Sequence, residues 1–521
     1  MEDFDQDGPR KRRRLSDDGQ IESSPTVRTL ERPVSPPPLR RALKTRKDVP
    51  SPFQLTRIHD LPESSNLSTV SLRDILGDPM IAECWEFNYL HDLDFLMDAF
   101  DPDVKDLVKV NVVHGFWKSE NPSRQRLKLQ AEKYANVKLH TAYMPEMFGT
   151  HHSKMIIVIR HDDMAQVIIH TANMIEFDWK NMTQAVWRSP LLPKASSGSL
   201  TNATMLNLEM GSGQKFKQDL LNYLRAYDTR RTICGSLVQE LSKYDFSQVH
   251  GALIASVPGR HGNDMNSGTL WGWPALKQAL TAVSVNEGSG EIVVQISSIA
   301  TLGPTDKWLN MFFKALQASK KKEINDIKFS IIFPTAEEIR RSLNGYGSGS
   351  AIHTKTQSDA QVKQLRYLRP ILSHWAGDVN SSYQESSALN DAGRRRAAPH
   401  IKTYIRFGDS QCSSIDWMLV TSANLSKQAW GEAMNVGGDV RICSYEIGVL
   451  VWPELYGDGA VMIPTFKTDL PGSVKSDAAV VVGARMPYDI PLQPYSKDDI
   501  PWCATATYTE QDWKGETWGN D

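Results

Sequence analysis

Gly149-Thr150-His151-His152-Ser153-Lys154 is the stretch that decides the fold, because the chain repeats its pattern later as Ala398-Pro399-His400-Ile401-Lys402-Thr403. Each copy contains a His-x-Lys motif and leads into an apolar, β-branched run, residues 155–159 and 404–407. Such runs are typical of strands, in which alternate side chains share a face. The His and Lys of each motif therefore point the same way, and the sequence predicts two copies of one structural unit.

A second apolar strand follows each motif and ends in an asparagine, Asn173 in the first copy and Asn424 in the second. Asn173 comes 21 residues after His152, and Asn424 comes 24 residues after His400. A single His-x-Lys occurs often by chance, whereas two copies with an Asn at similar spacing form a strong signal. The repeat predicts two related halves that share one site.

The chemistry of the predicted site follows from six side chains: His152, Lys154, Asn173, His400, Lys402 and Asn424. Two ammonium groups and two amides can bind the nonbridging oxygens of a phosphodiester and stabilise its transition state, a task that requires no metal ion. One imidazole can attack phosphorus while the other protonates the leaving oxygen and then activates water. The pattern therefore predicts phosphoryl transfer, although the near-symmetric sequence does not rank the two histidines.

The motifs resemble those of the phospholipase D superfamily, whose usual signature is HxKxxxxD. Ile159 and Phe407 occupy the Asp position of the two copies, so both copies depart from that signature. This departure and the surrounding residues resemble the tyrosyl-DNA phosphodiesterase family, and the resemblance extends from about Ser71 to the C-terminus. The stretches that carry it are Phe148–Lys154, His170–Asn173, Pro399–Tyr404 and Thr421–Lys427.

The resemblance implies an α/β fold of two similar phospholipase D-like domains. Each would be a mixed sheet flanked by helices, with a pseudo-two-fold relation and the active site at the interface. It also implies that His152 is the nucleophile and His400 the general acid and base. The implied substrate is a 3′-phosphotyrosyl bond between DNA and a stalled type I topoisomerase peptide, hydrolysed to a 3′-phosphate, with other 3′ adducts also processed. We expect no cofactor and no metal ion.

Two further residues are candidates for the role of the missing Asp residues. Gln184 follows Asn173 within a polar segment, and Glu446 follows Asn424 in the same way. An imidazole that reacts through one nitrogen needs its other nitrogen held by a partner, which fixes the tautomer and raises basicity. Sequence leaves open which histidine each residue contacts, and a cross-over between the halves is possible.

Five residues are candidates for contacts with DNA, each with a structural alternative. The family has aromatic residues at the positions of Tyr89 and Phe148, which by spacing alone could be core residues, and a serine near Ser350. Stacking of a DNA base on Phe148 would contribute about 1–3 kcal/mol. Ser426 and Lys427 begin a predicted helix whose free N–H groups suit a phosphate, although Ser426 could be an ordinary cap.

The chain divides into three predicted regions: residues 1–60, 61–247 and 248–521. Residues 1–60 are rich in Pro, Ser and charged residues and are predicted to be disordered. Their basic run Pro9–Arg14 is typical of nuclear import, although a solvated cluster is the alternative. The other two regions are predicted to be the two domains, the first of which contains a predicted helix over 72–100.

Composition restricts the class of protein further. The chain has no long apolar run, which predicts that it neither spans a membrane nor is secreted. Its five cysteines are scattered, as expected for a reduced intracellular protein. A net charge of −2 means that DNA binding must use a local basic groove. We expect a nuclear monomer that binds DNA and the topoisomerase-derived peptide.

Two other functions fit parts of this pattern. A lipid-hydrolysing phospholipase D would share the motifs, but the missing Asp residues and the basic run disfavour it. A DNA-end binding protein without activity could retain the fold, yet binding alone would not require two complete His, Lys and Asn sets. A turnover assay separates these alternatives.

Overall fold

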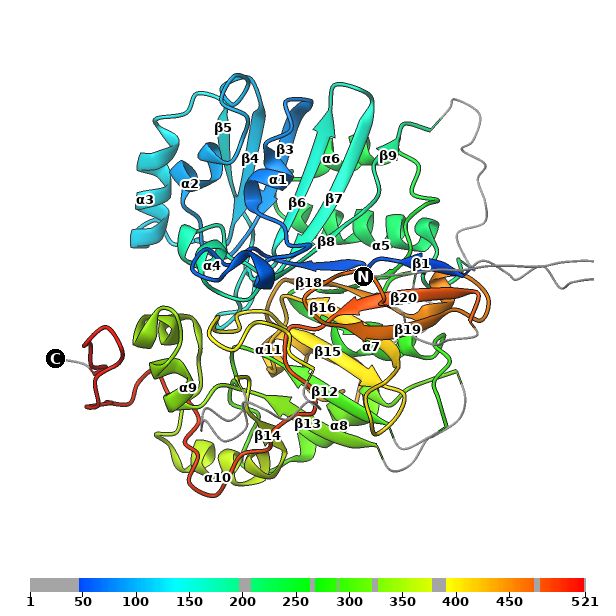
Figure 1. Ribbon diagram of the computed structural model, residues 1–521. Helices are drawn as coiled ribbons and strands as arrows, with labels where there is room; N and C mark the ends of the chain where they lie inside the picture. The colour runs from blue at the N-terminus through cyan, green and yellow to red at the C-terminus, as the bar shows by residue number, and fades with distance from the viewer. Residues whose placement is uncertain are drawn as a thin grey trace, which may run out of the picture. The chain divides into compact units, whose positions relative to one another are not determined.

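The computed structural model describes residues 46–195, 208–262, 268–287, 290–320, 327–376, 390–472 and 478–519. The predicted nuclear-import run, Pro9–Arg14, lies outside these residues. Arg46–Asp521 forms one compact unit built around two large sheets (Figure 1). Both sheets are mixed and carry helices, which confirms the predicted α/β fold class.

The first sheet has eight strands in the described residues and belongs to the first half of the chain. Its strands, in spatial order, are β2 (Phe53–Leu55), β8 (Ala185–Arg188), β7 (Met164–His170), β6 (Met155–Arg160), β3 (Ile81–Phe87), β4 (Lys109–His114) and β5 (Val137–Thr141), with β9 (Leu192–Pro193) paired to β7.

The second sheet has ten strands in the described residues, and all but the first come from the second half of the chain. Its strands, in spatial order, are β1 (Lys47–Val49), β20 (Val480–Arg485), β19 (Val461–Thr465), β16 (Ile415–Thr421), β15 (Thr403–Phe407), β12 (Glu291–Gln295), β13 (Lys328–Ile332) and β14 (Leu372–Ser373), while β18 (Glu446–Val451) pairs with β16 and with β10 (Ala252–Ser256). A separate ribbon joins β11 (Gly259–Gly262) to β17 (Asp439–Ile442).

The strand order reveals the same unit in both halves. In the first sheet β6, the strand after the first His-x-Lys, runs antiparallel to β3 on one side and β7 on the other. In the second sheet β15 runs antiparallel to β12 and β16 in the same way. The outer pairs also correspond, because β3–β4 and β12–β13 are both parallel. The sequence repeat is therefore a structural repeat.

Helices connect and cover the strands (Figure 1). The described helices are α1 (Leu72–Leu76), α2 (Leu93–Asp98), α3 (Pro122–Ala131), α4 (Glu176–Lys180), α5 (Gly213–Arg225), α6 (Gly235–Leu241), α7 (Gly272–Leu280), α8 (Lys307–Leu316), α9 (Ala336–Arg340), α10 (Asp359–Leu368) and α11 (Lys427–Trp430). Among the described helices, none is long and apolar enough to cross a membrane. All five cysteines are buried free thiols.

The predicted single helix over 72–100 is wrong, because this segment forms two short helices with the central strand β3 between them. β3 pairs with β4 on one edge and β6 on the other, and Cys84 and Trp85 are both buried. Glu83 and Glu86 interrupt the apolar residues of this strand, so its sequence shows neither the alternation nor the continuous apolar run of a typical strand. Long-range pairing therefore overrides the local pattern.

The predicted disorder up to residue 60 is also wrong from residue 47 onward. Strand β1 pairs with β20 of the second sheet, and β2 pairs with β8 of the first. Between them Ser51 donates its N–H to Asp469 O (2.8 Å) and its Oγ accepts a hydrogen bond from the N–H of Arg485 (3.0 Å). This segment joins the two sheets, although its composition resembles that of the preceding tail.

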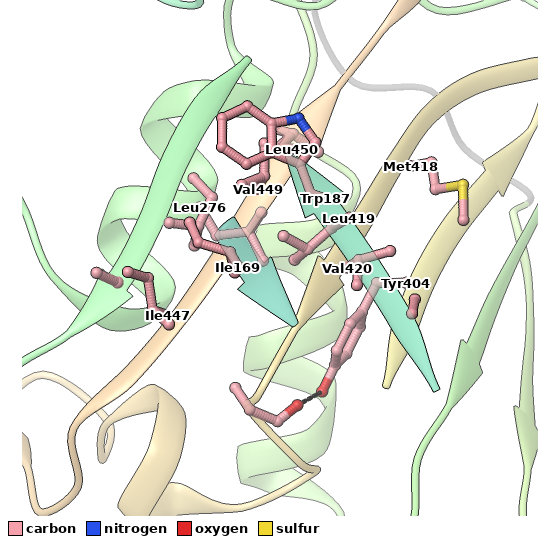
Figure 2. Packing of buried hydrophobic residues seen from close by; sticks show 14 of the residues in the cluster. Ile169, Trp187, Leu276, Tyr404, Met418, Leu419, Val420, Ile447, Val449 and Leu450 are labelled. Atoms are coloured by element: carbon pink, nitrogen blue, oxygen red, sulfur yellow. Dashed lines mark hydrogen bonds between the residues drawn. The ribbon is translucent and has the colours of Figure 1, made fainter. Parts of the chain in front are cut away.

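The two sheets meet in a common apolar core. Ile169 of β7 and Trp187 of β8 belong to the same buried cluster as Leu419 of β16 and Val449 of β18 (Figure 2). All four side chains are at most 3% exposed. Because close-packed interiors resist displacement, this core holds the two halves at a fixed distance. It thereby fixes the relative positions of the two His-x-Lys motifs.

Phe53→Ala is expected to lower the free energy of unfolding by about 3–5 kcal/mol, because it empties a buried site on β2. Phe53 is 1% exposed, whereas Lys47 on β1 is exposed and makes a suitable control. Lys47→Ala is expected to change stability by less than about 0.5 kcal/mol. Urea unfolding measures both variants. A loss below about 1 kcal/mol for Phe53→Ala would mean that the N-terminal segment contributes little to the core.

Candidate active site

A cavity of about 370 Å³ lies between the two halves and contains the predicted catalytic histidines. Residues of both repeats line it, which explains why one half alone would not form the site. The polar residues that matter most for chemistry are His152, Asn173 and Asp178 from the first half and His400, Asn424 and Glu446 from the second.

Main-chain hydrogen bonds place each His-x-Lys motif beside a segment of the opposite half. The N–H of His152 donates to Tyr445 O (3.0 Å), the residue directly before Glu446. In the same way the N–H of His400 donates to Thr183 O (3.1 Å), the residue directly before Gln184. The two contacts correspond in the repeat, and each brings a polar side chain of one half beside the imidazole of the other.

The His152 imidazole is held by Glu446, whose Oε2 lies 2.9 Å from Nδ1. Ser422 Oγ also donates to Glu446, so the carboxylate is fixed in turn. Burial lowers the pKa of His152, while the negative charge of Glu446 opposes that shift. The imidazole is therefore neutral at neutral pH, with Nδ1–H directed at Glu446 and the Nε2 lone pair available for attack.

The His400 imidazole has two partners from the first half. Its Nδ1 lies 3.0 Å from Gln184 Nε2 and 3.2 Å from Asp178 Oδ2. Burial lowers the pKa of His400 to about 3, and Lys402 adds to this effect while Asp178 opposes it. The carboxylate of Asp178 is placed to accept a hydrogen bond from Nδ1–H whenever His400 is an imidazolium.

Gln184 and Glu446 thus contact the imidazoles as the sequence suggested, and the cross-over that it left open is present on both sides. Asp178 was missed, although it lies six residues before Gln184 in the segment that follows Asn173. Its Oδ2 also accepts the N–H of Asn173 (2.6 Å), so one carboxylate supports residues of both motifs. A buried Asp in a polar segment was a weak signal, because sequence does not reveal which Asp is buried.

The two lysines lie behind the histidines, and both are fully buried. Lys154 Nζ donates to His152 O (3.0 Å), and Lys402 Nζ donates to His400 O. Burial lowers the pKa of Lys154 to about 8. Burial also moves the pKa of Lys402 well below its usual value, and the positive charge of Lys154 adds to that effect. Two cations held this close favour binding of an anion.

The asparagine of the second half is oriented by the main chain. Asn424 Oδ1 accepts hydrogen bonds from the N–H groups of Ser297 (3.0 Å) and Ser298 (2.9 Å). Its Nδ2 donors are therefore directed away from these amides, toward the cavity that Asn424 lines. Asn173 also lines the cavity, and its main-chain oxygen accepts a hydrogen bond from Trp179 Nε1 (3.0 Å). Both amides can donate to an oxyanion.

The residues between the reactive ones have structural roles. His151 Nδ1 lies 2.8 Å from Asn88 O and its Nε2 lies 3.0 Å from Tyr227 OH. Ser153 Oγ pairs with Tyr223 OH. These contacts lie on the opposite face of the motif from Lys154, in agreement with the alternation that the sequence predicts. Both ring nitrogens of His151 are occupied, so it is not a second candidate nucleophile.

Two exposed aromatic residues lie at the cavity. Tyr89 is 36% exposed, and its ring centroid lies 5.7 Å from that of His152. Phe148 is 76% exposed, an unfavourable state for a large apolar side chain unless it contacts a ligand. Both residues line the cavity, so Phe148 is not the core residue that spacing alone allowed, and Tyr89 is a partly exposed residue of the cavity wall.

The three remaining DNA-contact candidates differ in their placement. Within the described residues, the cavity lining includes Ser350 and Ser426 but not Lys427. Ser426 is the N-cap of α11, where its Oγ accepts the N–H of Ala429 (3.0 Å), and α11 begins at Lys427. Ser350 Oγ donates to Gly347 O (2.8 Å). Ser426 is therefore an ordinary cap that also faces the cavity.

Comparison with known proteins places the chain in one family. The family model for tyrosyl-DNA phosphodiesterase matches residues 52–496. A probable tyrosyl-DNA phosphodiesterase of Schizosaccharomyces pombe is 32% identical, over 91% of this chain and 97% of the relative. Tyrosyl-DNA phosphodiesterase 1 of Arabidopsis thaliana is 30% identical, over 92% of this chain and 78% of that protein.

Solved structures agree on the fold. The crystal structure of the yeast tyrosyl-DNA phosphodiesterase superposes with a TM-score of 0.62 at 22% identity and covers 88% of this chain and 99% of that chain. At this identity the structural match concerns the fold, whereas the family model and the relatives concern the sequence. Taken together, these matches show that the chain belongs to the tyrosyl-DNA phosphodiesterase family of phosphodiester hydrolases.

Proposed function

We propose that this hydrolase cleaves the 3′-phosphotyrosyl bond between DNA and a type I topoisomerase peptide through a phosphohistidine intermediate, leaving a 3′-phosphate. The observation that carries the proposal is the crossed pair of imidazoles: each has its Nδ1 held by the opposite half, and both rings line one cavity. Two oriented imidazoles are what a two-step displacement requires, one as nucleophile and one as proton donor and acceptor.

In the first step His152 Nε2 attacks phosphorus, and a P–N bond forms as the P–O bond to tyrosine breaks. The leaving phenolate oxygen takes a proton from Nε2 of the His400 imidazolium, whose Nδ1–H is directed at Asp178. Lys154, Lys402, Asn173 and Asn424 stabilise the charge on the nonbridging oxygens. The substrate itself favours protonation of His400, because its negative charge counteracts the lysines that lower this pKa.

In the second step His400, now neutral, accepts a proton from water at Nε2. The water oxygen attacks phosphorus from the side that tyrosine has left, the P–N bond breaks, and DNA with a 3′-phosphate is released. Glu446 holds the Nδ1 proton of His152 in both steps, so Nε2 can leave as part of a neutral ring. The cycle returns both imidazoles to their starting state.

The proposal extends to the oligomeric state, other substrates, the cellular location and the form of DNA that is bound. Both His, Lys and Asn sets come from one chain, so the site is complete in a monomer. We also expect other 3′ adducts with a comparable leaving group to be processed. The basic run Pro9–Arg14 supports action in the nucleus. The exposed ring of Phe148 at the cavity, on which a base can stack, supports binding of single-stranded DNA next to the scissile bond.

The decisive experiment is a gel assay with a single-stranded oligonucleotide that carries a 3′-phosphotyrosine, in excess EDTA. Conversion to a 3′-phosphate end supports the reaction, the substrate and the metal-free mechanism together. Activity that EDTA abolishes and magnesium or zinc restores would contradict the mechanism. Tight binding without conversion would favour a DNA-end binding protein. Absence of binding would favour a phosphodiesterase that acts on lipids or other phosphodiesters.

The rate at limiting substrate is expected to fall as the pH rises above about 8. Lys154 has a pKa of about 8 and must be protonated to attract the phosphate, so loss of its proton weakens substrate binding. The kcat/KM profile of the free enzyme measures this effect and should decline about tenfold per pH unit on its alkaline side. A profile that stays level between pH 7.5 and about 9.5 would contradict a role for charged Lys154.

Asp178→Asn is expected to lower kcat by about 10²-fold with a smaller change in KM. The amide keeps the shape but removes the charge that supports protonated His400, so His400 accepts a proton from water less readily in the hydrolysis step. Asp98 on α2 lies outside the active-site cavity, and Asp98→Asn is the matched control. Steady-state kinetics of the two variants measure the difference. Equal kcat values for Asp178→Asn and Asp98→Asn would mean that Asp178 has no part in the mechanism.

A further inference from the structure

The loop after β4 presents an exposed tryptophan beside the active site. Trp117 is 54% exposed, and Lys118 Nζ lies 5.3 Å from the centroid of its ring. Lys118 covers one face of the ring in a favourable cation–π contact, and the other face is available for a stacking partner. Neither residue takes part in the chemistry described above.

The sheet places this loop on the same edge as the nucleophile. β4 runs parallel to β3, and β3 runs antiparallel to β6, so the end of β4 and the start of β6 lie at one edge. Two strand spacings separate them, about 10 Å. Gly115 packs directly on His151, the neighbour of His152, where an added Cβ would lie 2.4 Å from His151 Cβ. The loop is therefore adjacent to the catalytic cavity.

The loop is tied to its surroundings and holds Trp117 in place. The N–H of Trp117 donates to Gly115 O (2.9 Å), and Arg124 Nη1 donates to Trp117 O (2.8 Å). Asn121 caps the first turn of α3 through the N–H groups of Ser123 and Arg124. An aromatic platform that is already ordered loses little entropy when a ligand stacks on it.

The charge of this segment differs from that of the whole chain. Residues 115–133 contain five Lys or Arg and two Glu, a net charge of +3, while the full chain has a net charge of −2. Arg126 and Lys128 are exposed on α3, and no carboxylate among the described residues is paired with them. A basic segment around an exposed indole matches the composition of single-strand binding surfaces.

We propose that Trp117 and Lys118 form a secondary binding surface for single-stranded DNA that continues beyond the catalytic cavity. One base stacks on the open face of the Trp117 ring, and Lys118 binds an adjacent phosphate. The end of β4 and the start of β6 are about 10 Å apart, and Trp117 lies three residues beyond the end of β4, so at about 3.4 Å per stacked nucleotide a strand must extend at least about three nucleotides from the cavity to reach it. An acidic peptide would use the cations but not the exposed ring, so nucleic acid is the better match.

The proposal rests on the proposed function only for its kinetic test. KM and kcat are measured with 3′-phosphotyrosyl oligonucleotides of 2 and 20 nucleotides, of which the shorter does not reach the loop, and the affinity for an unmodified fluorescent 20-mer is measured by anisotropy. Trp117→Ala is expected to raise KM for the 20-mer and to weaken its binding about 5- to 150-fold, the range for loss of one stacked base. The 2-mer should be unaffected.

Three further variants sharpen the test. Trp117→Phe keeps a stacking ring and should retain most of the length preference. Lys118→Ala should reduce the slope of log K against log salt by about 0.7, as for one phosphate contact on a single strand. Leu129→Ala, at a 64% exposed position on α3, should behave as the wild type.

Several outcomes would overturn the proposal. Equal losses on the 2-mer and the 20-mer would place Trp117 inside the catalytic site, and no loss on either would exclude the surface. Dependence on the size of the leaving peptide, without dependence on DNA length, would make it a peptide-binding surface. If the wild type shows no turnover but anisotropy retains the effect of Trp117→Ala, the surface stands and the proposed function fails.

Discussion

His152→Ala is expected to reduce turnover of a 3′-phosphotyrosyl oligonucleotide by about 10⁴- to 10⁶-fold and to abolish the covalent enzyme–DNA adduct. The physical reason is that His152 supplies the nitrogen that bonds to phosphorus, and no neighbouring side chain can take its place. His151 has both ring nitrogens occupied by Asn88 and Tyr227. Single-turnover kinetics and a denaturing gel measure the rate and the adduct.

The control for this variant is an imidazole outside the site. His161 is exposed in the turn after β6, and His161→Ala should have the activity of the wild type. Thermal unfolding of both variants should be close to that of the wild type, because His152 is partly exposed and makes one side-chain hydrogen bond. An adduct that persists in His152→Ala would show that His400, or another residue, is the nucleophile.

His400→Asn is expected to give the opposite phenotype, an adduct that forms and then accumulates. Formation needs little help from an acid, because a phenol with a pKa of about 10 is a good leaving group. Hydrolysis needs a base to activate water, whose pKa is 15.7 in bulk. Loss of that base should slow hydrolysis of the adduct about 10²- to 10⁴-fold. The adduct is then the main species on a denaturing gel.

The comparison with His152→Ala makes this test sharp. The double variant, His152→Ala with His400→Asn, should form no adduct, because the nucleophile is absent whatever the rate of hydrolysis. Absence of adduct in the single His400→Asn variant, with turnover also lost, would mean that His400 is needed for bond cleavage itself. Rapid turnover in that variant would exclude His400 as the base.

Much of the fold was predictable because it follows from a repeated local pattern. The strands after the two His-x-Lys motifs are β6 and β15, and the strands that end before Asn173 and Asn424 are β7 and β16. These segments alternate or run apolar over a length typical of strands, and the repeat doubles the signal. The pairing of β6 with β7 and of β15 with β16 follows from their proximity in the chain.

The errors came where long-range contacts decide the structure. The sequence of β3 lacks a typical strand pattern because it contains Glu83 and Glu86, and its strand conformation depends on pairing with β4 and β6. The segment at residues 47–55 resembles a disordered tail in composition, but it forms strands because β1 pairs with β20 and β2 pairs with β8, both distant in sequence. Local composition contains no information on which edges are open.

The sequence by itself determined the identity of the reactive groups: two histidines, two lysines and two asparagines at the ends of paired strands, with Gln184 and Glu446 nearby. These follow from residue types and spacing, which a linear chain records. Only the tertiary structure decided that Glu446 holds His152 and that Asp178 joins Gln184 at His400. The reason is that these contacts cross between the halves, and packing of one sheet against the other sets their distances.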